Sequence, residues 1–150
     1  MKHEIRVLRP GDDHLLEAAA DGVFDRAVEA RLSREFLSDP RHHIVAAIEN
    51  GRAIGFVSAL DYVHPDKPRD LWINEVAVAP SHHGRGIGRE LLDAMLNLGR
   101  SLDCGEAWVL TDRANTAAMR LYSGARGVTA PQDNVMFNFR LDDKDRGHEQ

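Results

Sequence analysis

The sequence has very little cysteine and no long apolar run. Cys104 is the single cysteine among 150 residues, which excludes an internal disulfide and a thiolate cage for zinc. No stretch approaches the ~20 consecutive apolar residues of a membrane-spanning helix. Residues 1–8 alternate polar and apolar side chains and lack the apolar run of a signal peptide. We therefore expect a soluble, cytoplasmic protein that holds no metal and has no membrane partner.

Positive charge is also scarce. The chain has 19 Lys and Arg residues against 24 Asp and Glu residues, and its formal net charge is −5. Nucleic-acid binders concentrate Lys and Arg on one face, so we expect no nucleic-acid partner. A cationic partner suits the charge better, but many acidic proteins gain only solubility from it. The length suits one hydrophobic core, and we expect a single domain over residues 1–141 with a polar tail at 142–150.

Apolar periodicity predicts that strands and helices are interleaved in an α/β (α+β) fold. Asn50-Gly51 separates two short apolar runs and favours the positive backbone φ of a hairpin turn. The predicted strands cover residues 1–8, 44–48, 53–57, 71–79, 107–110 and 135–141, and the predicted helices cover residues 15–20, 25–37, 87–99 and 115–122.

Three glycines lie between the strand at 71–79 and the helix that follows it. Gly84, Gly86 and Gly88 let the backbone approach an anion without a Cβ in the way. The N–H groups at the helix start carry about half a positive charge, and Arg85 and Arg89 can pair with phosphates. The segment therefore predicts an anion cradle.

Other glycine motifs do not fit this spacing. A P-loop requires a Lys-Ser/Thr pair after its last glycine, whereas Gly88 is followed by Arg89-Glu90. A dinucleotide fingerprint requires G-x-G-x-x-G near the first strand, and this loop has neither that spacing nor that position. A glycine-rich turn without a ligand remains the alternative.

Residues 76–92, read with a second motif at 115–122, resemble the Gcn5-related N-acetyltransferases (GNAT). The first motif of that family reads Arg/Gln-x-x-Gly-x-Gly/Ala, and His83 stands here at its first position. The second reads Asn-x-x-Ala-x-x-Leu-Tyr, as in the segment from Asn115 to Tyr122. The resemblance implies a central mixed, mostly antiparallel sheet with a parallel splayed pair and helices on both faces. It also implies acetyl-coenzyme A as co-substrate.

The resemblance further assigns residues to coenzyme A. Asn115 would contact the pantetheine arm, and the Tyr122 hydroxyl would act as general acid at the thioester sulfur; a half-buried core tyrosine is the alternative for Tyr122. Seven residues separate the two, which predicts that they share one side of a helix. The cofactor-binding residues are expected to be Val76, Ala77, Val78, His83, Gly84, Arg85, Gly86, Ile87, Gly88, Arg89, Asn115, Ala118 and Tyr122.

Glu75 is the candidate general base. It is a carboxylate in an otherwise largely apolar strand, immediately before the segment expected to bind the cofactor. A carboxylate there can accept a proton from an ammonium group directly or through water. A solvated residue where the sheet opens is the alternative.

For the acceptor, the chain resembles the short aminoglycoside 3-N-acetyltransferases. The resemblance rests on Pro68-Arg69, on the acidic residue before Val76-Ala77-Val78, and on the terminal segment from Val135. It implies an aminoglycoside acceptor and an antibiotic-resistance enzyme. An aminoglycoside is a polycation, and an acceptor cleft is expected to be rimmed by Asp61, Glu75, Asp112 and Asp133. Ordinary solvated loop residues are the alternative for the aspartates.

Other functions fit the same residues. The acceptor of such an enzyme can be a protein N-terminus, a polyamine or another small amine, and a coenzyme A-binding sensor without transfer activity is a different class. The terminal strand and residues 124–133 are candidates for a homodimer contact.

Overall fold

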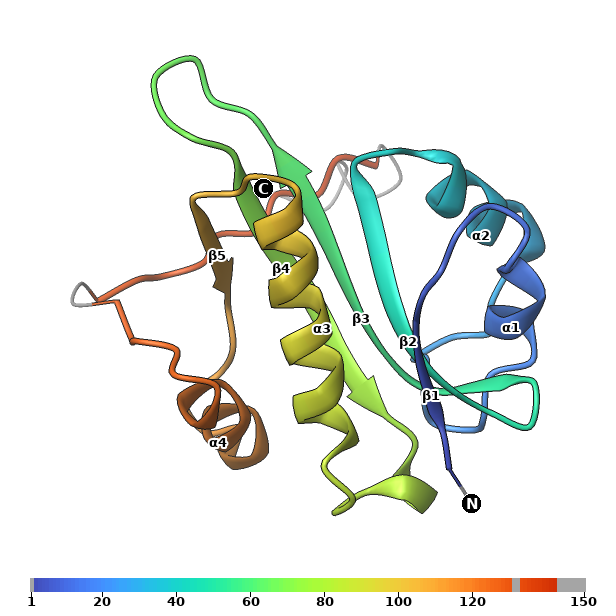
Figure 1. Cartoon of the computed structure of the whole chain (residues 1–150). Helices are drawn as coiled ribbons and strands as arrows, with labels where there is room; N and C mark the ends of the chain where they lie inside the picture. Colours follow the sequence, from blue (N-terminus) through green and yellow to red (C-terminus); the bar gives the residue numbers. More distant parts are fainter. Residues whose placement is uncertain (1, 131–132, 143–150) are drawn as a thin grey trace.

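The computed structural model describes residues 2–130 and 133–142. Five strands form one sheet in the order β1-β2-β3-β4-β5; neighbours are antiparallel except β4 and β5, which are parallel (Figure 1). The elements in chain order are β1 (Glu4–Val7), α1 (Asp13–Glu17), α2 (Ala30–Ser38), β2 (His42–Glu49), β3 (Arg52–Tyr62), β4 (Asp70–Val78), the 3₁₀ turn η1 (Pro80–His82), α3 (Ile87–Ser101), β5 (Glu106–Val109) and α4 (Thr116–Gly124).

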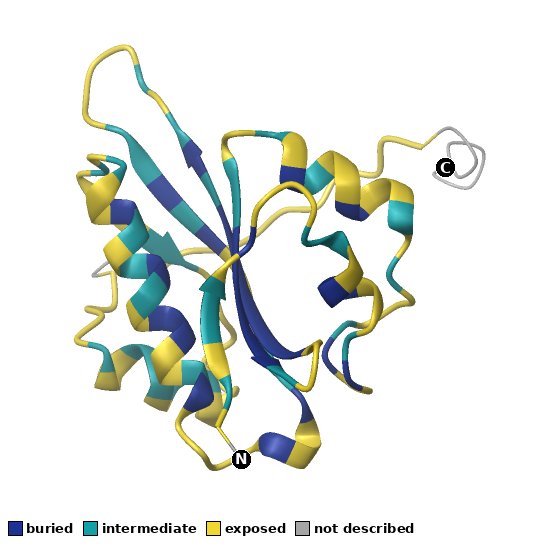
Figure 2. Ribbon diagram, turned by 45° about the vertical axis from the view of Figure 1, so that its right-hand side comes forward, coloured by how far each residue is buried: buried dark blue, intermediate teal, exposed yellow. Residues whose placement is uncertain are grey.

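Helices cover both faces of the sheet (Figure 2). Alternate residues of a strand point to opposite faces, and β3 shows this directly. Gly55 faces α3, since a Cβ built on it would lie 3.3 Å from Leu91 Cδ1. Phe56 points to the other face and stacks on Phe24, with ring centroids 4.4 Å apart. The predicted mixed sheet with helices on both faces is confirmed.

The tight turn between β2 and β3 is also confirmed. Asn50 and Gly51 have φ angles of 53° and 74°, which are those of the mirror-image turn that matches strand twist. This turn lets β2 and β3 form the buried centre of the sheet, where Val45, Ala46 and Val57 have no exposed surface.

The parallel pair β4 and β5 is joined at one end only. Its register runs from Asp70 opposite Glu106 to Ile73 opposite Val109, whereas β4 continues to Val78. Trp72 and Trp108 stack across the paired end with ring centroids 5.4 Å apart. The two strands therefore form the predicted splayed pair, and each leads into a helix, α3 after β4 and α4 after β5.

Most predicted boundaries shift by a few residues, and β3 continues to Tyr62 where the predicted strand ends at residue 57. Three further differences concern a helix end, a helix start and a strand. The helix predicted to end near Gly99 continues to Ser101; a Cβ on Gly99 would lie 2.9 Å from Leu71 Cδ2, so this glycine permits close packing of α3 on β4. The helix predicted over 25–37 begins only at Ala30, and residues 25–29 have no helical structure.

The third difference is the predicted final strand at 135–141, which is wrong. Residues 133–142 carry no strand pairing, and Val135, Phe137 and Phe139 are 74%, 77% and 81% exposed. Alternating apolar residues favour a strand only where a partner edge and a core are present. Most of the predicted tail, residues 143–150, lies outside the described residues. Among the helices that the structure describes, none is long and apolar enough to cross a membrane.

Candidate active site

The glycine loop at the start of α3 has free space around its glycines, but its positive φ angles would strain any residue with a side chain. Gly84 and Gly86 have φ angles of 77° and 76°, and a Cβ on either would meet no atom within 4 Å. Gly86 is the N-cap of α3, and no side chain caps this helix end. The N–H groups of the first turn therefore remain for an external acceptor. Loop shape and helix end fit the pyrophosphate group that the sequence motif predicts.

Three elements meet behind this loop. A Cβ on Gly88 would lie 3.7 Å from Leu121 Cδ2 of α4 and 3.9 Å from Val78 Cγ2 of β4. Arg89 joins α3 to α4, because its Nη1 donates to the Gly124 carbonyl at 2.6 Å and its Nε to Asp93 at 3.0 Å. The start of α3, the end of β4 and α4 thus pack against one another. They lie at the end of the sheet where β4 and β5 separate.

His83 and Arg85 take different positions in the loop. The Nε2 of His83 donates to the Val78 carbonyl at 2.8 Å, so in this structure the side chain holds the loop against β4. Arg85 is exposed on the same loop. Contact of either side chain with a phosphate stays a prediction.

Asn115 and Tyr122 have different positions in α4: Asn115 caps its start, and Tyr122 lies within the helix. Asn115 is the N-cap, and its Oδ1 accepts from the Ala118 N–H at 3.1 Å. Its side-chain oxygen therefore stabilises the helix end. Tyr122 is half-buried and packs against the hydrophobic core. Burial raises the pKa of its hydroxyl.

Glu75 is placed by an irregularity in β4. Ser58 pairs with Glu75, and the next pair is Ala59 with Ile73, so Asn74 is an extra residue. Such a bulge disrupts the alternation of side chains and re-aims them. Both Asn74 and Glu75 are exposed and line one groove of about 540 Å³ on the face of the sheet opposite α3.

The groove combines an apolar floor with carboxylates. Its carboxylates belong to Asp25, Glu29 and Glu75, and Arg26 is its one cation among the lining residues. The stacked rings of Phe24 and Phe56 form part of the floor. Its remaining lining residues are Leu16, Ala27, Val28, Leu32, Ser33, Phe36, Ile44, Ser58 and Asn74. The groove is suited to an organic cation of moderate size.

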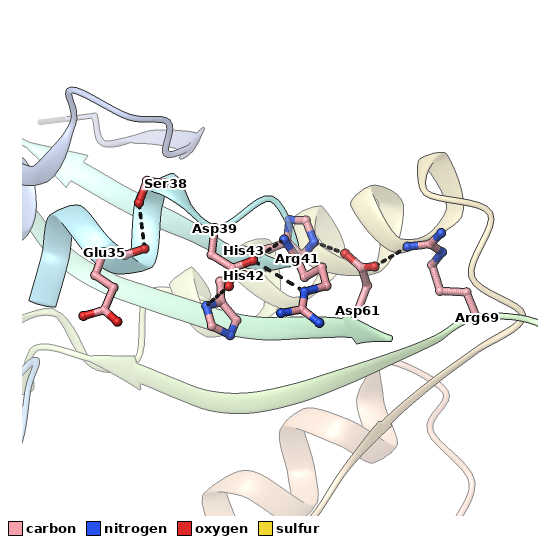
Figure 3. Close-up of polar contacts among 8 residues, drawn as sticks. All are labelled: Glu35, Ser38, Asp39, Arg41, His42, His43, Asp61 and Arg69. Atoms are coloured by element: carbon pink, nitrogen blue, oxygen red, sulfur yellow. Dashed lines mark hydrogen bonds and ion pairs between the residues drawn. The ribbon is translucent and has the colours of Figure 1, made fainter. Parts of the chain in front are cut away.

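Asp61 is not on the rim of a cleft, and that prediction is wrong. It belongs to β3 and is 2% exposed. His43 Nε2 and Arg69 Nη1 donate to its two carboxylate oxygens from opposite sides (Figure 3). Burial opposes ionisation of Asp61, but the hydrogen bonds and charges of His43 and Arg69 outweigh it and hold the pKa below its usual value. Asp61 joins β2, β3 and the segment before β4.

The other predicted acceptor residues are exposed but lie apart from the groove lining. Asp112 Oδ1 accepts from the Ala114 N–H at 2.9 Å in the turn before α4. Asp133 is exposed in the segment after α4. Of the four predicted acceptor-binding residues, the groove contains Glu75. Among the described residues, no group of three or more His, Cys, Asp or Glu side chains could hold a metal ion.

Sequence reasoning missed most of the groove. Asp25, Arg26 and Glu29 come from a segment that the apolar spacing assigned to a helix. Ser33 and Ser58 line the groove as buried polar residues, 6% and 8% exposed. In the sequence, the charged pair Asp25-Arg26 precedes the apolar positions of this segment, but nothing in the pattern shows which part of the fold these charges face.

Comparison with known proteins gives one family. The model described as "Acetyltransferase (GNAT) family" matches residues 13–127. An L-2,4-diaminobutyric acid acetyltransferase of Streptomyces anulatus is 36% identical over 102 residues, 65% of this chain and 56% of that protein. The N-alpha-acetyltransferase RimI of Mycobacterium tuberculosis is 31% identical over 93 residues, 62% of this chain and 56% of that protein. The alignments thus span a little over half the length of these curated relatives.

Solved structures share the fold. The crystal structure of an aminoglycoside acetyltransferase from an uncultured soil metagenomic sample has a TM-score of 0.78. It is 23% identical and covers 95% of this chain and 100% of that chain. At this identity the likeness concerns the fold.

Proposed function

The chain belongs to the acetyltransferase (GNAT) family, and from this membership we propose that it transfers the acetyl group of acetyl-coenzyme A to a small cationic amine in the groove beside Glu75. One observation carries the proposal. The bulge in β4 aims Glu75 into an acidic groove, and nine residues later the same stretch of chain forms the open glycine loop. A proton acceptor and a cradle for a pyrophosphate are thus parts of one continuous segment.

The residues divide the work as follows. Glu75 accepts the proton that the ammonium group loses, so that the neutral nitrogen attacks the thioester carbonyl carbon. A backbone N–H of Val76 or Val78 polarises the carbonyl oxygen. The carbon–nitrogen bond forms as the carbon–sulfur bond breaks, and the Tyr122 hydroxyl donates its proton to the departing sulfur. The second proton that the nitrogen loses as it becomes an amide returns through solvent to the Tyr122 oxygen, and Glu75 releases its proton to solvent. The Tyr122 hydroxyl is protonated at neutral pH, as this role requires, and burial raises its pKa so that it stays protonated at more alkaline pH.

The proposed acceptor is an aminoglycoside. Three carboxylates in the groove support a polycation, since each ion pair at ~4 Å contributes ~1 kcal/mol in water and ~4 kcal/mol at an effective dielectric of 20. The shared fold with an aminoglycoside acetyltransferase agrees with this choice. Cytoplasmic localisation and a homodimer stay predictions.

A second candidate is a small diamino acid. Arg26 lines the groove together with Glu75, and a guanidinium is the side chain best suited to a carboxylate. An acceptor with an amine at one end and a carboxylate at the other would use both. The similarity to a diaminobutyric acid acetyltransferase supports this candidate. Because the chain is also similar to the N-alpha-acetyltransferase RimI, a peptide amine is a further acceptor to test.

Thiol release from acetyl-coenzyme A tests these acceptors in parallel. We would supply a gentamicin-type aminoglycoside, 2,4-diaminobutyrate, a polyamine and a peptide amine at equal concentration. Turnover confined to the aminoglycoside supports the first candidate, and turnover confined to diaminobutyrate and lost in Arg26→Gln supports the second. Coenzyme A binding without turnover of any amine would favour a non-catalytic sensor and contradict the proposal.

A further inference from the structure

His82 is a buried histidine that the proposed chemistry does not use. It is 8% exposed and lies two residues before Gly84. Both ring nitrogens are engaged: Nδ1 lies 2.7 Å from Ser81 Oγ, and Nε2 lies 3.2 Å from each oxygen of Glu49. A carboxylate can only accept, so Nε2 carries the hydrogen and, in the neutral ring, Nδ1 accepts from the Ser81 hydroxyl.

Glu49 connects this histidine to a distant part of the chain. It is the last residue of β2, next to the Asn50-Gly51 turn. The hydrogen bond from His82 lowers the pKa of Glu49; burial opposes this, and the charges of His82 and Arg85 add to the lowering. Glu49 is therefore an ionised anchor at the end of β2, one of the central strands of the sheet.

The anchored turn is the direct support of the glycine loop. Three residues, Pro80 to His82, form η1 between β4 and the loop. Its backbone bonds run from the His82 N–H to the Ala79 carbonyl at 2.8 Å and from the His83 N–H to the Pro80 carbonyl at 3.3 Å. Gly84 and Gly86 have wide conformational freedom, so a loop built on them needs a fixed starting point to aim its N–H groups in one direction.

We propose that His82, held by Glu49 and Ser81, is a positioning residue that fixes the glycine loop for coenzyme A. The inference rests on the proposed function, because it takes this loop as the pyrophosphate site. The side chain points to Glu49 and Ser81 and acts on the loop through the η1 backbone. Prior ordering of the loop lowers the entropy lost on binding. Loss of the His82–Glu49 bond therefore weakens coenzyme A binding and leaves the acceptor groove intact.

The dissociation constant of coenzyme A, measured by calorimetry without acceptor, tests this role. His82→Ala is expected to raise it about tenfold, a loss of ~1.4 kcal/mol. His82→Gln, whose amide can still donate to Glu49, is expected to stay within about threefold of the wild type. Glu49→Ala is expected to match His82→Ala, whereas Glu49→Gln keeps an acceptor oxygen and retains affinity. Because Glu49 is at the end of a strand, its variants provide the test if His82→Ala fails to fold.

His43→Ala is the matched control. Like His82, His43 donates to a carboxylate: His43 belongs to β2, and its partner is Asp61 of β3. It lies six residues from Glu49, ~20 Å along the strand. It should lower the free energy of unfolding without changing the dissociation constant. Equal dissociation constants for wild type and His82→Ala, or equal weakening by His82→Ala and His43→Ala, would overturn the inference. Additive effects in the His82→Ala/Glu49→Ala double variant would also overturn it. A wild-type protein that does not bind coenzyme A would instead contradict the proposed function.

Discussion

Tyr122 keeps its hydroxyl proton at neutral pH, and burial raises its pKa so that the proton is also kept at more alkaline pH than in an exposed tyrosine. Replacement by Phe retains the ring that packs against the core and removes the proton. We expect Tyr122→Phe to lower kcat by about 10²–10⁴-fold. In the wild type, kcat should show no fall from ionisation of this group until the pH exceeds the ordinary tyrosine pKa of ~10.

Tyr62→Phe is the control for this measurement. The Tyr62 hydroxyl accepts from Trp108 Nε1 at 2.6 Å and donates to Asp70 at 3.3 Å. Its loss should lower stability by about 1 kcal/mol and leave kcat unchanged. Equal kcat in Tyr122→Phe and wild type would remove the general-acid role.

Asp61 shows why single residues are harder to assign than motifs. Its position in the sequence, before a loop rich in proline and charge, gave it the appearance of a cleft residue. The partners that bury it, His43 and Arg69, lie 18 and eight residues away. Glu75 is predicted from its local neighbours, whereas the role of Asp61 depends on contacts between β2, β3 and the segment before β4 that no local pattern encodes.

Asp61→Asn is therefore expected to affect stability and not the acceptor. Its folded pKa is lowered, so its contribution to stability is present above the unfolded pKa of ~3.9 and is lost as the pH falls below it. The variant should lose roughly 1–3 kcal/mol of unfolding free energy at pH 7 and less of it near pH 3, measured by urea denaturation. A raised KM for the acceptor at unchanged stability would return Asp61 to the acceptor site.

At the scale of elements, the start of α3 depends on backbone that only glycine adopts easily. A Cβ on Gly86 meets no atom within 4 Å, so Gly86→Ala is penalised through its φ of 76°. We expect a cost of roughly 1–2 kcal/mol and a weaker affinity for coenzyme A by calorimetry. Gly11→Ala is the control, because Gly11 also has a positive φ, 102°, and no neighbour within 4 Å. Gly11→Ala should cost similar stability and leave the affinity for coenzyme A unchanged. An identical effect of both variants on this affinity would contradict the assignment of the glycine loop to coenzyme A.

The elements differ in how far the sequence predicts them. The strand, glycine loop and helix from residue 71 onward were predicted closely because their turn chemistry and periodicity are local. The helix predicted from residue 25 failed at its start, because residues 25–29 line the groove and Phe24 stacks on Phe56. The bulge at Asn74, on which the groove depends, has no marker in the sequence, since it follows from how β3 and β4 pair.

For the whole molecule, the central question is how charge selects the acceptor. The chain is acidic overall, but in the proposed function selection rests on the three carboxylates of one groove. Raising the salt from ~0.1 M to ~1 M shortens the Debye length from ~10 Å to ~3 Å. The KM of a polycationic acceptor should therefore rise about fivefold, and less in an Asp25→Asn/Glu29→Gln variant. Equal salt dependence in variant and wild type would place acceptor binding elsewhere.

The exposed apolar residues of 133–142 bear on assembly. Val135, Phe137 and Phe139 are each more than two-thirds exposed, and the predicted homodimer would place this segment in a contact. Light scattering at micromolar concentration tests that prediction, and a monomer would contradict it. Neither result changes the assignment of the groove or the glycine loop.

The most direct test is the rate of thiol release by Glu75→Gln and wild type, measured with the best acceptor at saturating acetyl-coenzyme A. The variant keeps the size and polarity of the side chain in the groove and loses the proton acceptor. The account predicts that kcat falls by about 10²–10⁴-fold while the dissociation constant of coenzyme A stays the same. A variant as active as the wild type would contradict the assignment of this groove and its carboxylate to the reaction.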